Sequence, residues 1–447
     1  MYEHNFNLTG LFCRSKGIFE MKIILGLIYN LVILPVLYFL VLIGTLFNSK
    51  LREGFIGRFY SISTLRSFFS GKNQTREVYW FHVASHGEFQ QALPVIKGLK
   101  EIEPSCLILI SFFSPSGFNH AGHELVDCKF YLPFDFIWTV QKTLNIINPK
   151  KIIFAGYDIW PNLVWISNLR NIHTTIFATH INSRSPKLYP VIKNFYRSIY
   201  DSFSTIYTIS GLDYLHLQKI VSAKNSPLIR VLGNPRFDHV KDHADSFSKE
   251  RTKSLLDRKK RIIAGSVWPE DESMIFEPLI QLLKENKEIF LLWIPHEPKN
   301  EVINSAVQKF VRSGIVTTVH SSANSLELGD SQVVVVGVVG ILSKLYWQGQ
   351  IAYIGGGFSS GVHNVMEPAI ARLPVLFGSK YDNSQEAKEL IATGGGFSIT
   401  TSNEFSTQLR SLLNNQEHYI NTSFAATDVI HNNLGSSTRV VRGIIRD

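Results

Sequence analysis

The longest feature in the hydrophobic pattern is a mostly apolar run near the start of the 447-residue chain, residues 23–47. The run carries no charged residue. About 20 apolar residues suffice for one helix to cross the roughly 30 Å hydrocarbon core of a bilayer, so the run predicts a membrane anchor. The chain that follows alternates short apolar runs with amphipathic stretches. This pattern is typical of an α/β enzyme, here one held at a membrane surface.

The residues that flank this run indicate its orientation. Basic residues are more frequent after it than before it, and basic flanks stay on the cytoplasmic side of a membrane. Those that follow are Lys50, Arg52, Arg58, Arg66, Lys72 and Arg76, and those that precede are Arg14, Lys16 and Lys22. We therefore expect the rest of the chain in the cytoplasm. A cleaved signal peptide is the alternative, but the run is long for one and no small-residue cleavage site follows it.

Two series of alternating strand and helix patterns follow the anchor. Apolar runs at 78–84, 107–113, 151–155, 175–178 and 205–209 form the first series, and runs at 261–264, 289–294, 333–336, 350–354 and 375–377 form the second. Helical patterns lie between them, at 89–99, 138–147, 273–284, 301–312 and 385–393. Buried strands separated by helices predict parallel sheets with helices on both faces. The polar stretch 238–260 is typical of a linker or an exposed helix.

These patterns divide the chain into four parts. We expect an N-terminal extension, 1–20, that need not be native because Met21 is a plausible start, and a membrane anchor, 21–50. Two Rossmann-like α/β domains, 51–240 and 241–447, follow and should face a cleft. Ligands of open parallel sheets bind outside the carboxyl ends of the strands, so functional motifs are expected directly after strands.

Composition and charge narrow the function. The net charge of +9 suits an anionic membrane surface or phosphorylated substrates. A nucleic-acid partner is not expected, because no dense basic stripe with interleaved aromatic residues is present. The three cysteines are too scattered for a zinc site or a disulfide framework. No Asp-x-Asp triplet, phosphate-loop motif or Gly-x-Ser-x-Gly elbow occurs, so we expect neither a metal-bridged diphosphate site nor a bound metal.

The first motif after a strand is Ser85-His86-Gly87-Glu88. Glu88 falls in the first turn of the next helix, where its carboxylate could act as a general base on a sugar hydroxyl. The alternative is that Glu88 only complements the helix dipole.

Two further motifs offer hydroxyl and carboxylate groups. The segment 111–117 places serines at a helix start, where they could hold an anion or form an ordinary N-cap. Asp158 comes just before Pro161, which suits a first helical turn. Asp158 is either a carboxylate of the acceptor site or a helix cap.

The glycine-rich segment 355–368 carries the most specific local chemistry. Glycines after a strand let backbone N–H groups approach a phosphate. Glu367 lies one turn further on and could accept hydrogen bonds from both hydroxyls of a ribose. The alternative is a plain flexible loop. Segments 264–269 and 295–298 also end strands and could line a nucleotide pocket, although a lone histidine such as His296 is often only solvated.

Together, these motifs resemble the bacterial transferases of 3-deoxy-D-manno-octulosonic acid (Kdo) in lipopolysaccharide assembly. The matching blocks occur in order and span the chain from about Met21 to its C-terminus. They are 84–88 (ASHGE), 131–135 (YLPFD), 159–162 (IWPN), 233–238 (GNPRFD), 264–269 (AGSVWP) and 363–368 (HNVMEP).

The resemblance implies a GT-B glycosyltransferase that moves Kdo from its donor CMP-Kdo to the lipid A precursor, at the cytoplasmic face of the inner membrane and in contact with its lipids. It implies no cofactor. Glu88 matches the catalytic base. The implied nucleotide-binding positions are Pro295, His296, Val339, Gly340, Ile341, Asn364, Val365, Met366 and Glu367.

Three segments depart from the family's usual pattern. His296 and Glu297 stand where the family has Arg-His, and Ile341 stands where it has Glu. The usual Glu-Thr-Glu is replaced by residues 156–158, Gly-Tyr-Asp. Two rival functions stay open: a GT-B transferase that uses a UDP-sugar and another lipid acceptor, and a membrane-tethered nucleotide-binding protein without catalysis.

A single base suffices for the expected chemistry, because the donor already carries a phosphate leaving group. Direct displacement would invert the anomeric carbon, with Glu88 taking the proton of the acceptor hydroxyl. Ser85, Asp158, Arg52 and Arg58 are the candidate acceptor contacts. The arginines lie close to the membrane, where they meet either a phosphorylated headgroup or anionic lipids in general.

Overall fold

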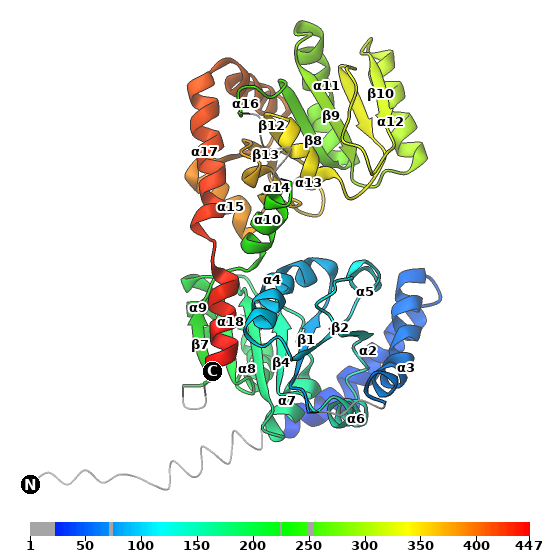
Figure 1. The fold of residues 1–447 in the computed structure, drawn as a ribbon, viewed down its shortest axis with the longest axis vertical. Coiled ribbons are helices and arrows are strands. Elements are labelled where there is room, and N and C mark those ends of the chain that lie inside the picture. The colour runs from blue at the N-terminus through cyan, green and yellow to red at the C-terminus, as the bar shows by residue number, and fades with distance from the viewer. Residues whose placement is uncertain (1–22, 71–74, 224–225, 248–253) are drawn as a thin grey trace, which may run out of the picture. The chain divides into compact units, whose positions relative to one another are not determined.

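The computed structural model describes residues 23–70, 75–223, 226–247 and 254–447. The predicted extension 1–20 lies outside these residues. Contacts within the chain divide it into two compact units, one made of Met1–Arg236 with Gly435–Asp447 and the other of Phe237–Leu434. Each unit is built on its own parallel sheet (Figure 1).

The first unit contains a seven-stranded parallel sheet with the order β3-β2-β1-β4-β5-β6-β7. Its strands are β1 (Val78–Val83), β2 (Leu107–Phe112), β3 (Cys128–Tyr131), β4 (Lys151–Ala155), β5 (His173–Thr179), β6 (Thr205–Thr208) and β7 (Leu228–Val231). The helices between them are α4 (His86–Ile102), α5 (Pro115–His120), α6 (Ile137–Ile147), α7 (Pro161–Leu169), α8 (Pro190–Tyr200) and α9 (Gly211–Gln218). All five predicted strands are confirmed. Strands β3 and β7 were missed, because β3 is short and contains a lysine and β7 is largely exposed.

The chain returns to the first unit at its end. Helix α18 (Ser436–Arg446) packs against α4, and its Val440, Val441 and Ile444 are buried in the same hydrophobic cluster as that helix (Figure 1). The hydroxyl of Tyr207 on β6 donates to the carboxylate of the terminal Asp447, at 3.0 Å. The sequence-based division had assigned 435–447 to the second domain. A return of this kind depends on long-range packing, which no local pattern records.

The apolar run near the start forms a helix from Ile23 to Gly44, long and apolar enough to cross a membrane. It contains a π-helical segment, η1 (Tyr29–Ile33), followed by α2 (Leu34–Gly44). The helix ends before the predicted Phe47, because Asn48 caps a new helix, α3 (Ser49–Phe69), by accepting from the N–H groups of Lys50 and Leu51.

The second unit contains a seven-stranded parallel sheet with the order β10-β11-β9-β8-β12-β13-β14. Its strands are β8 (Arg261–Val267), β9 (Phe290–Pro295), β10 (Thr317–His320), β11 (Val333–Val336), β12 (Ile351–Ile354), β13 (Val375–Gly378) and β14 (Gly396–Ile399). Its helices include α10 (Arg236–Asp245), α11 (Pro269–Glu285), α12 (Asn300–Arg312), α13 (Leu342–Leu345), α14 (Met366–Ile370), α15 (Gln385–Thr393), α16 (Ser402–Asn414) and α17 (Gln416–Asn432). The predicted strands are confirmed, and β10 and β14 were missed. The polar stretch from residue 238 begins as helix α10.

Candidate functional site

The strand order fixes where chemistry can occur in each unit. In the first sheet, β1 lies between β2 and β4, so the chain reverses its direction of travel across the sheet at β1. In the second sheet, β8 lies between β9 and β12 in the same way. Ligands of open parallel sheets bind at such reversals, outside the carboxyl ends of the strands. The residues after β1 and β4, and those after β8, β9 and β12, therefore form the candidate site regions.

Glu88 lies at the reversal point of the first sheet, in the first turn of α4. The hydroxyl of Ser85, the N-cap residue, accepts from the N–H of Glu88 at 3.4 Å. In return, Oε2 of Glu88 accepts from the N–H of Ala84. This reciprocal pair resembles a capping box. One carboxylate oxygen of Glu88 is therefore used to stabilise the start of the helix. The other oxygen, Oε1, is directed toward Gly156 at the end of β4.

The electrostatic surroundings of Glu88 favour proton uptake. Burial raises the pKa of Glu88, and the charge of Asp158 raises it further, while the N–H of Ala84 and His82 oppose this shift. A carboxylate with a raised pKa is a stronger base than one in water. The arrangement is therefore chemically suited to accept a proton from a hydroxyl.

Asp158 faces the same edge of the sheet. Its Oδ2 lies 3.2 Å from Nε2 of His82 and accepts from the indole N–H of Trp160 at 3.1 Å. The alternative that Asp158 caps the next helix is wrong, because the N-cap residue of α7 is Trp160 and the first N–H groups of that helix donate to the carboxylate of Asp135 instead. The carboxylate of Asp158 is 27 % exposed, so it is open to a ligand.

His82 was missed by the sequence analysis, although it orients Asp158. It is buried on β1, and its Nδ1 lies 3.0 Å from the hydroxyl of Ser111. An ionised carboxylate can only accept, so Nε2 of His82 donates to Asp158. Trp80 donates to the same hydroxyl at 2.8 Å. The sequence did contain a signal for this role, because His82 lies inside an otherwise apolar strand and directly before a motif.

The two candidate arginines have different environments. The guanidinium of Arg58 lies 4.5 Å from the ring centre of Phe113, donates to the carbonyl of Phe113 at 2.8 Å, and has a pKa lowered by burial to about 10. Phe113 in turn packs against Trp160, with ring centres 5.2 Å apart. Arg58 is therefore charged at neutral pH and lies beside the Asp158 loop. Arg52 instead donates to the carbonyls of Thr45 and Leu46 at the end of α2.

Of the serines in segment 111–117, Ser114 forms an ordinary N-cap. Ser114 accepts from the N–H of Gly117 at 3.2 Å and begins α5, a helix of six residues. The N-cap alternative is thus confirmed for this segment.

In the second unit, three flat side chains meet at the carboxyl ends of neighbouring strands. The ring of His296, after β9, stacks on Trp268, after β8, with centres 4.2 Å apart. The indole N–H of Trp268 donates to Nε2 of His363 at 2.9 Å, and the two imidazole centres are 4.6 Å apart. Burial lowers the pKa of both histidines, so both rings are neutral at neutral pH. They form a stack of uncharged rings.

The glycine-rich loop is held in place by Asp271, which the sequence analysis also missed. Asp271 is fully buried in the first turn of α11. Its carboxylate accepts from the N–H of Gly356 at 2.7 Å, the N–H of Trp268 at 3.0 Å and the hydroxyl of Tyr353 at 2.8 Å. A Cβ at Gly355 would overlap the carbonyl oxygen of Ser266. These contacts argue against a plain flexible loop.

The other predicted nucleotide-binding residues differ in what they can present. The side chains of Ile341, Val365 and Met366 are buried in the hydrophobic core, so only their backbone groups can meet a ligand. Val339 and Gly340 are exposed, and Pro295 ends β9.

Asn364 and Glu367 flank the start of α14. The side chain of Asn364 accepts from the N–H of Met366 at 3.1 Å, and Glu367 is partly exposed in the first turn. Because α14 has five residues, its dipole contributes less than that of a full helix. The ligand roles of these residues stay predictions.

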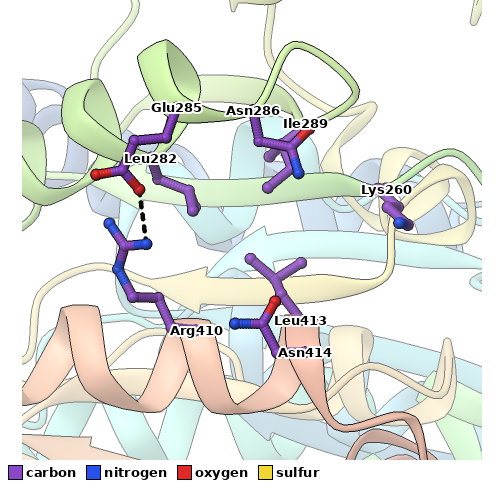
Figure 2. Close-up of a pocket in the computed structure, with 8 residues that line it drawn as sticks. All are labelled: Lys260, Leu282, Glu285, Asn286, Ile289, Arg410, Leu413 and Asn414. Atoms are coloured by element: carbon purple, nitrogen blue, oxygen red, sulfur yellow. Dashed lines mark ion pairs between the residues drawn. The ribbon is translucent and has the colours of Figure 1, made fainter.

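A pocket of the second unit lies away from this chemistry. It is lined by residues of α11 and α16 and by the segments that lead into β8 and β9 (Figure 2). An ion pair between Arg410 and Glu285 crosses it, with 2.7 Å between the charged atoms. The pocket thus lies at the amino ends of the strands, opposite the edge where parallel sheets bind substrate.

Two Rossmann-like units of this kind define the GT-B class of fold. The crystal structure of UDP-GlcNAc 2-epimerase from Neisseria meningitidis bound to UDP-GlcNAc is similar to the chain, with a TM-score of 0.58 and 13 % sequence identity. The similarity covers 83 % of this chain and 100 % of that one. The predicted fold class is confirmed. The predicted cleft between the two domains stays a prediction.

The resemblance to the Kdo transferases is also confirmed. Residues 58–239 match the family described as 3-deoxy-D-manno-octulosonic-acid transferase. A 3-deoxy-D-manno-octulosonic acid transferase of Haemophilus influenzae is 25 % identical over 81 % of this chain and 85 % of its own length. A bifunctional glycosyltransferase/methyltransferase of Fusobacterium nucleatum is 26 % identical over 83 % of this chain, which spans 58 % of that relative. These similarities support a glycosyltransferase.

Proposed function

We propose that this chain is an inverting glycosyltransferase that moves Kdo from CMP-Kdo to the lipid A precursor, lipid IVA, at the cytoplasmic face of the inner membrane. The similarity to Kdo transferases supports the reaction class. The observation that carries the proposal is Glu88, a partly buried carboxylate with a raised pKa at the reversal point of the first sheet.

The chemistry follows from the groups present. Glu88 takes the proton from an acceptor hydroxyl while the oxygen attacks the anomeric carbon and the bond to the CMP phosphate breaks. Attack from the face opposite the leaving group inverts the configuration. CMP leaves as a monophosphate anion, so no strong protein acid is required, and we propose that backbone N–H groups near Asn364 stabilise its charge without a metal ion.

On the acceptor side, Asp158 and Arg58 are the proposed contacts. Asp158 is partly exposed beside Glu88, and Arg58 places a positive charge beside the Phe113–Trp160 pair, where it can meet a phosphate of the lipid. Arg52 is better explained as a cap of α2, since its Nε and Nη2 donate to the carbonyls of Thr45 and Leu46 at the end of that helix. Ser85 acts through its cap of α4.

On the donor side, the stacked rings of Trp268, His296 and His363 support binding of a nucleotide. Neutral flat rings can stack on a base without a charge penalty. The rigid loop at Gly356 can present backbone N–H groups to the phosphate, and Glu367 can accept from the ribose hydroxyls. Pro295, Val339, Gly340, Ile341, Val365 and Met366 are proposed to complete the site through their backbone.

The test is transfer by the detergent-solubilised protein. Incubation with CMP-Kdo and lipid IVA should give products heavier by the mass of Kdo, as read by mass spectrometry. Glu88→Ala should lower kcat by about a thousandfold or more, the scale of losing a general base, and leave CMP binding intact. Glu101→Ala, at the exposed far end of the same helix, is the matched control.

Three results would contradict the proposal. Substantial turnover by Glu88→Ala would exclude Glu88 as the base. Displacement of the donor by UDP but not by CMP would favour the rival transferase that uses a UDP-sugar. Nucleotide binding without any transfer would favour the non-catalytic alternative.

A further inference from the structure

Two polar residues interrupt the outward-facing apolar helix, and both bind the first unit. The hydroxyl of Tyr29 donates to Oδ2 of Asp135 at 2.9 Å. The side-chain amide of Asn30 forms a reciprocal pair with that of Asn162, with donor–acceptor distances of 3.0 and 2.7 Å. Polar side chains are costly in an apolar segment that faces lipid, and they usually mark a specific contact. A simple tether would need neither residue.

The partners of these two residues form one buried network at the start of α7. Asp135 is 1 % exposed. Besides Tyr29, it accepts from the N–H of Asn162 at 2.9 Å and from the N–H of Leu163 at 3.0 Å. The side chain of Asn162 also donates to the backbone carbonyl of Asp135, at 2.5 Å. Asp135 therefore caps α7 and receives Tyr29 at the same time.

Ring packing extends this contact along the helix. Tyr29 lies edge-on to Trp165, with ring centres 5.8 Å apart, and Tyr38 packs on Phe55 and Phe134 at 5.4 and 5.1 Å. From Tyr29 to Tyr38 the helix rises about 14 Å. Leu31, on the other side of the helix, is 72 % exposed. One face of the helix is thus docked on the unit, while the other is free to meet lipid.

The docked network adjoins the loop that carries the acceptor residues. Asn162 follows Trp160 by two positions and Asp158 by four, and Trp160 donates to Asp158. The loop directly precedes α7. If the apolar helix shifted relative to α7, the distance between the loop and the apolar helix would therefore change as well.

We propose that the Tyr29–Asp135 and Asn30–Asn162 contacts form a positioning clamp, which fixes the Asp158–Trp160 loop in register with the apolar helix and therefore at a set distance from the membrane. This inference rests on the proposed function, because it assigns the clamp a purpose in meeting a lipid-borne acceptor. Tyr29 and Asn30 are positioning residues and do not touch the reacting atoms.

The variants Tyr29→Phe and Asn30→Ala loosen the clamp and keep the fold. Asp135 retains its two backbone donors in both, so α7 stays capped and the loop keeps its local shape. Tyr38→Phe is the matched control, because it removes a hydroxyl from the same helix at a residue that docks through its ring.

The first measurement compares two acceptors. With lipid IVA in phosphatidylethanolamine–phosphatidylglycerol vesicles, kcat/KM should fall about tenfold in each clamp variant. With a deacylated, water-soluble form of the same acceptor it should fall less than about twofold, because that acceptor reaches the loop from solution. Asn30→Ala and Asn162→Ala combined should be no worse than Asn162→Ala alone, as expected for a shared contact, because Asn162 also donates to the carbonyl of Asp135. Equal losses on both acceptors, or additive effects, would overturn the proposal.

A second measurement does not depend on activity, so it separates failure of the clamp from failure of the proposed function. Spin labels at the exposed positions Leu31, on the helix, and Leu169, at the end of α7, report the distance between them. The distance distribution should be narrow in the parent and in Tyr38→Phe, and clearly broader in Tyr29→Phe and Asn30→Ala. An unchanged distribution in the clamp variants would refute the clamp even if transfer is confirmed.

Discussion

At the scale of single residues, the carboxylate of Glu88 combines a structural contact with its proposed role as the base. Oε2 binds the N–H of Ala84 and holds the start of α4, which fixes the direction of Oε1 toward the end of β4. Because its side chain is already ordered, the proposed base would lose little further conformational entropy when the acceptor binds. The neighbouring charge of Asp158, itself oriented by His82, raises the pKa of Glu88 beyond the effect of burial.

This pairing predicts a pH effect. Glu88 acts as a base only when ionised, so the acid limb of kcat/KM should lie above the ordinary pKa of a glutamate, about 4.3. Asp158→Asn removes a negative charge and should therefore lower the pKa of Glu88 and move that limb to lower pH. Glu101→Gln should leave it in place. A limb that moves to higher pH in Asp158→Asn would contradict the coupling.

Gly156 offers a second test at this scale. Its φ of +81° disfavours other residues, and a Cβ there would lie 2.9 Å from Oε1 of Glu88. Gly156→Ala should lower the unfolding free energy by about 1–2 kcal/mol and reduce kcat by displacing the carboxylate. Gly314→Ala is the control, since Gly314 has a φ of +80° and no atom within 4 Å of its Cβ position. Thermal unfolding should show a similar cost for both, and only Gly156→Ala should lose turnover.

At the scale of elements, the sequence predicted the strands and helices that have a clear local hydrophobic pattern. Strand β4, fully buried, was predicted with its exact bounds because four of its five residues, 152–155, form a continuous apolar run. Strand β7 was missed because its side chains are mostly exposed, and α18 was assigned to the wrong unit because its partner α4 is far away in sequence. Glu88 and Asp158 were found because they follow strands. The role of Asp271 was missed because it lies between two other acidic residues in the first turn of α11, Glu270 and Glu272. Acidic residues at that position usually only complement the helix dipole.

Asp271 therefore carries the prediction at this scale. Asp271→Ala leaves the N–H of Gly356 and the hydroxyl of Tyr353 without their acceptor, which costs about 1–3 kcal/mol for each buried group left unpaired. The glycine-rich loop should loosen, and CMP should bind about tenfold more weakly by calorimetry. Glu270→Gln, one residue earlier and exposed, should bind CMP normally. Unchanged CMP affinity in Asp271→Ala would show that the glycine-rich loop does not contribute to nucleotide binding.

At the scale of the whole molecule, the apolar helix has two faces with different partners. Tyr29 and Leu34 are buried against the first unit, whereas Leu31 and Leu40 are 72 % and 60 % exposed. The sequence predicted the helix from its apolar composition but not this division, because a uniformly apolar run gives no sign of which face will dock. Asn30 marks the docked face through its pair with Asn162.

The exposed face should carry the affinity for lipid. A lysine at the centre of a membrane helix costs about 2.5–3.5 kcal/mol on insertion scales, so Leu31→Lys together with Leu40→Lys should move much of the protein from the membrane pellet to the supernatant after fractionation. Leu31→Ala with Leu40→Ala is the matched control and should stay in the pellet. Because neither leucine touches the Glu88 or Asp158 environment, the lysine variant should keep its transfer to a water-soluble acceptor while losing transfer to vesicles. Retention of the lysine variant in the membrane would show that other surfaces hold the protein there.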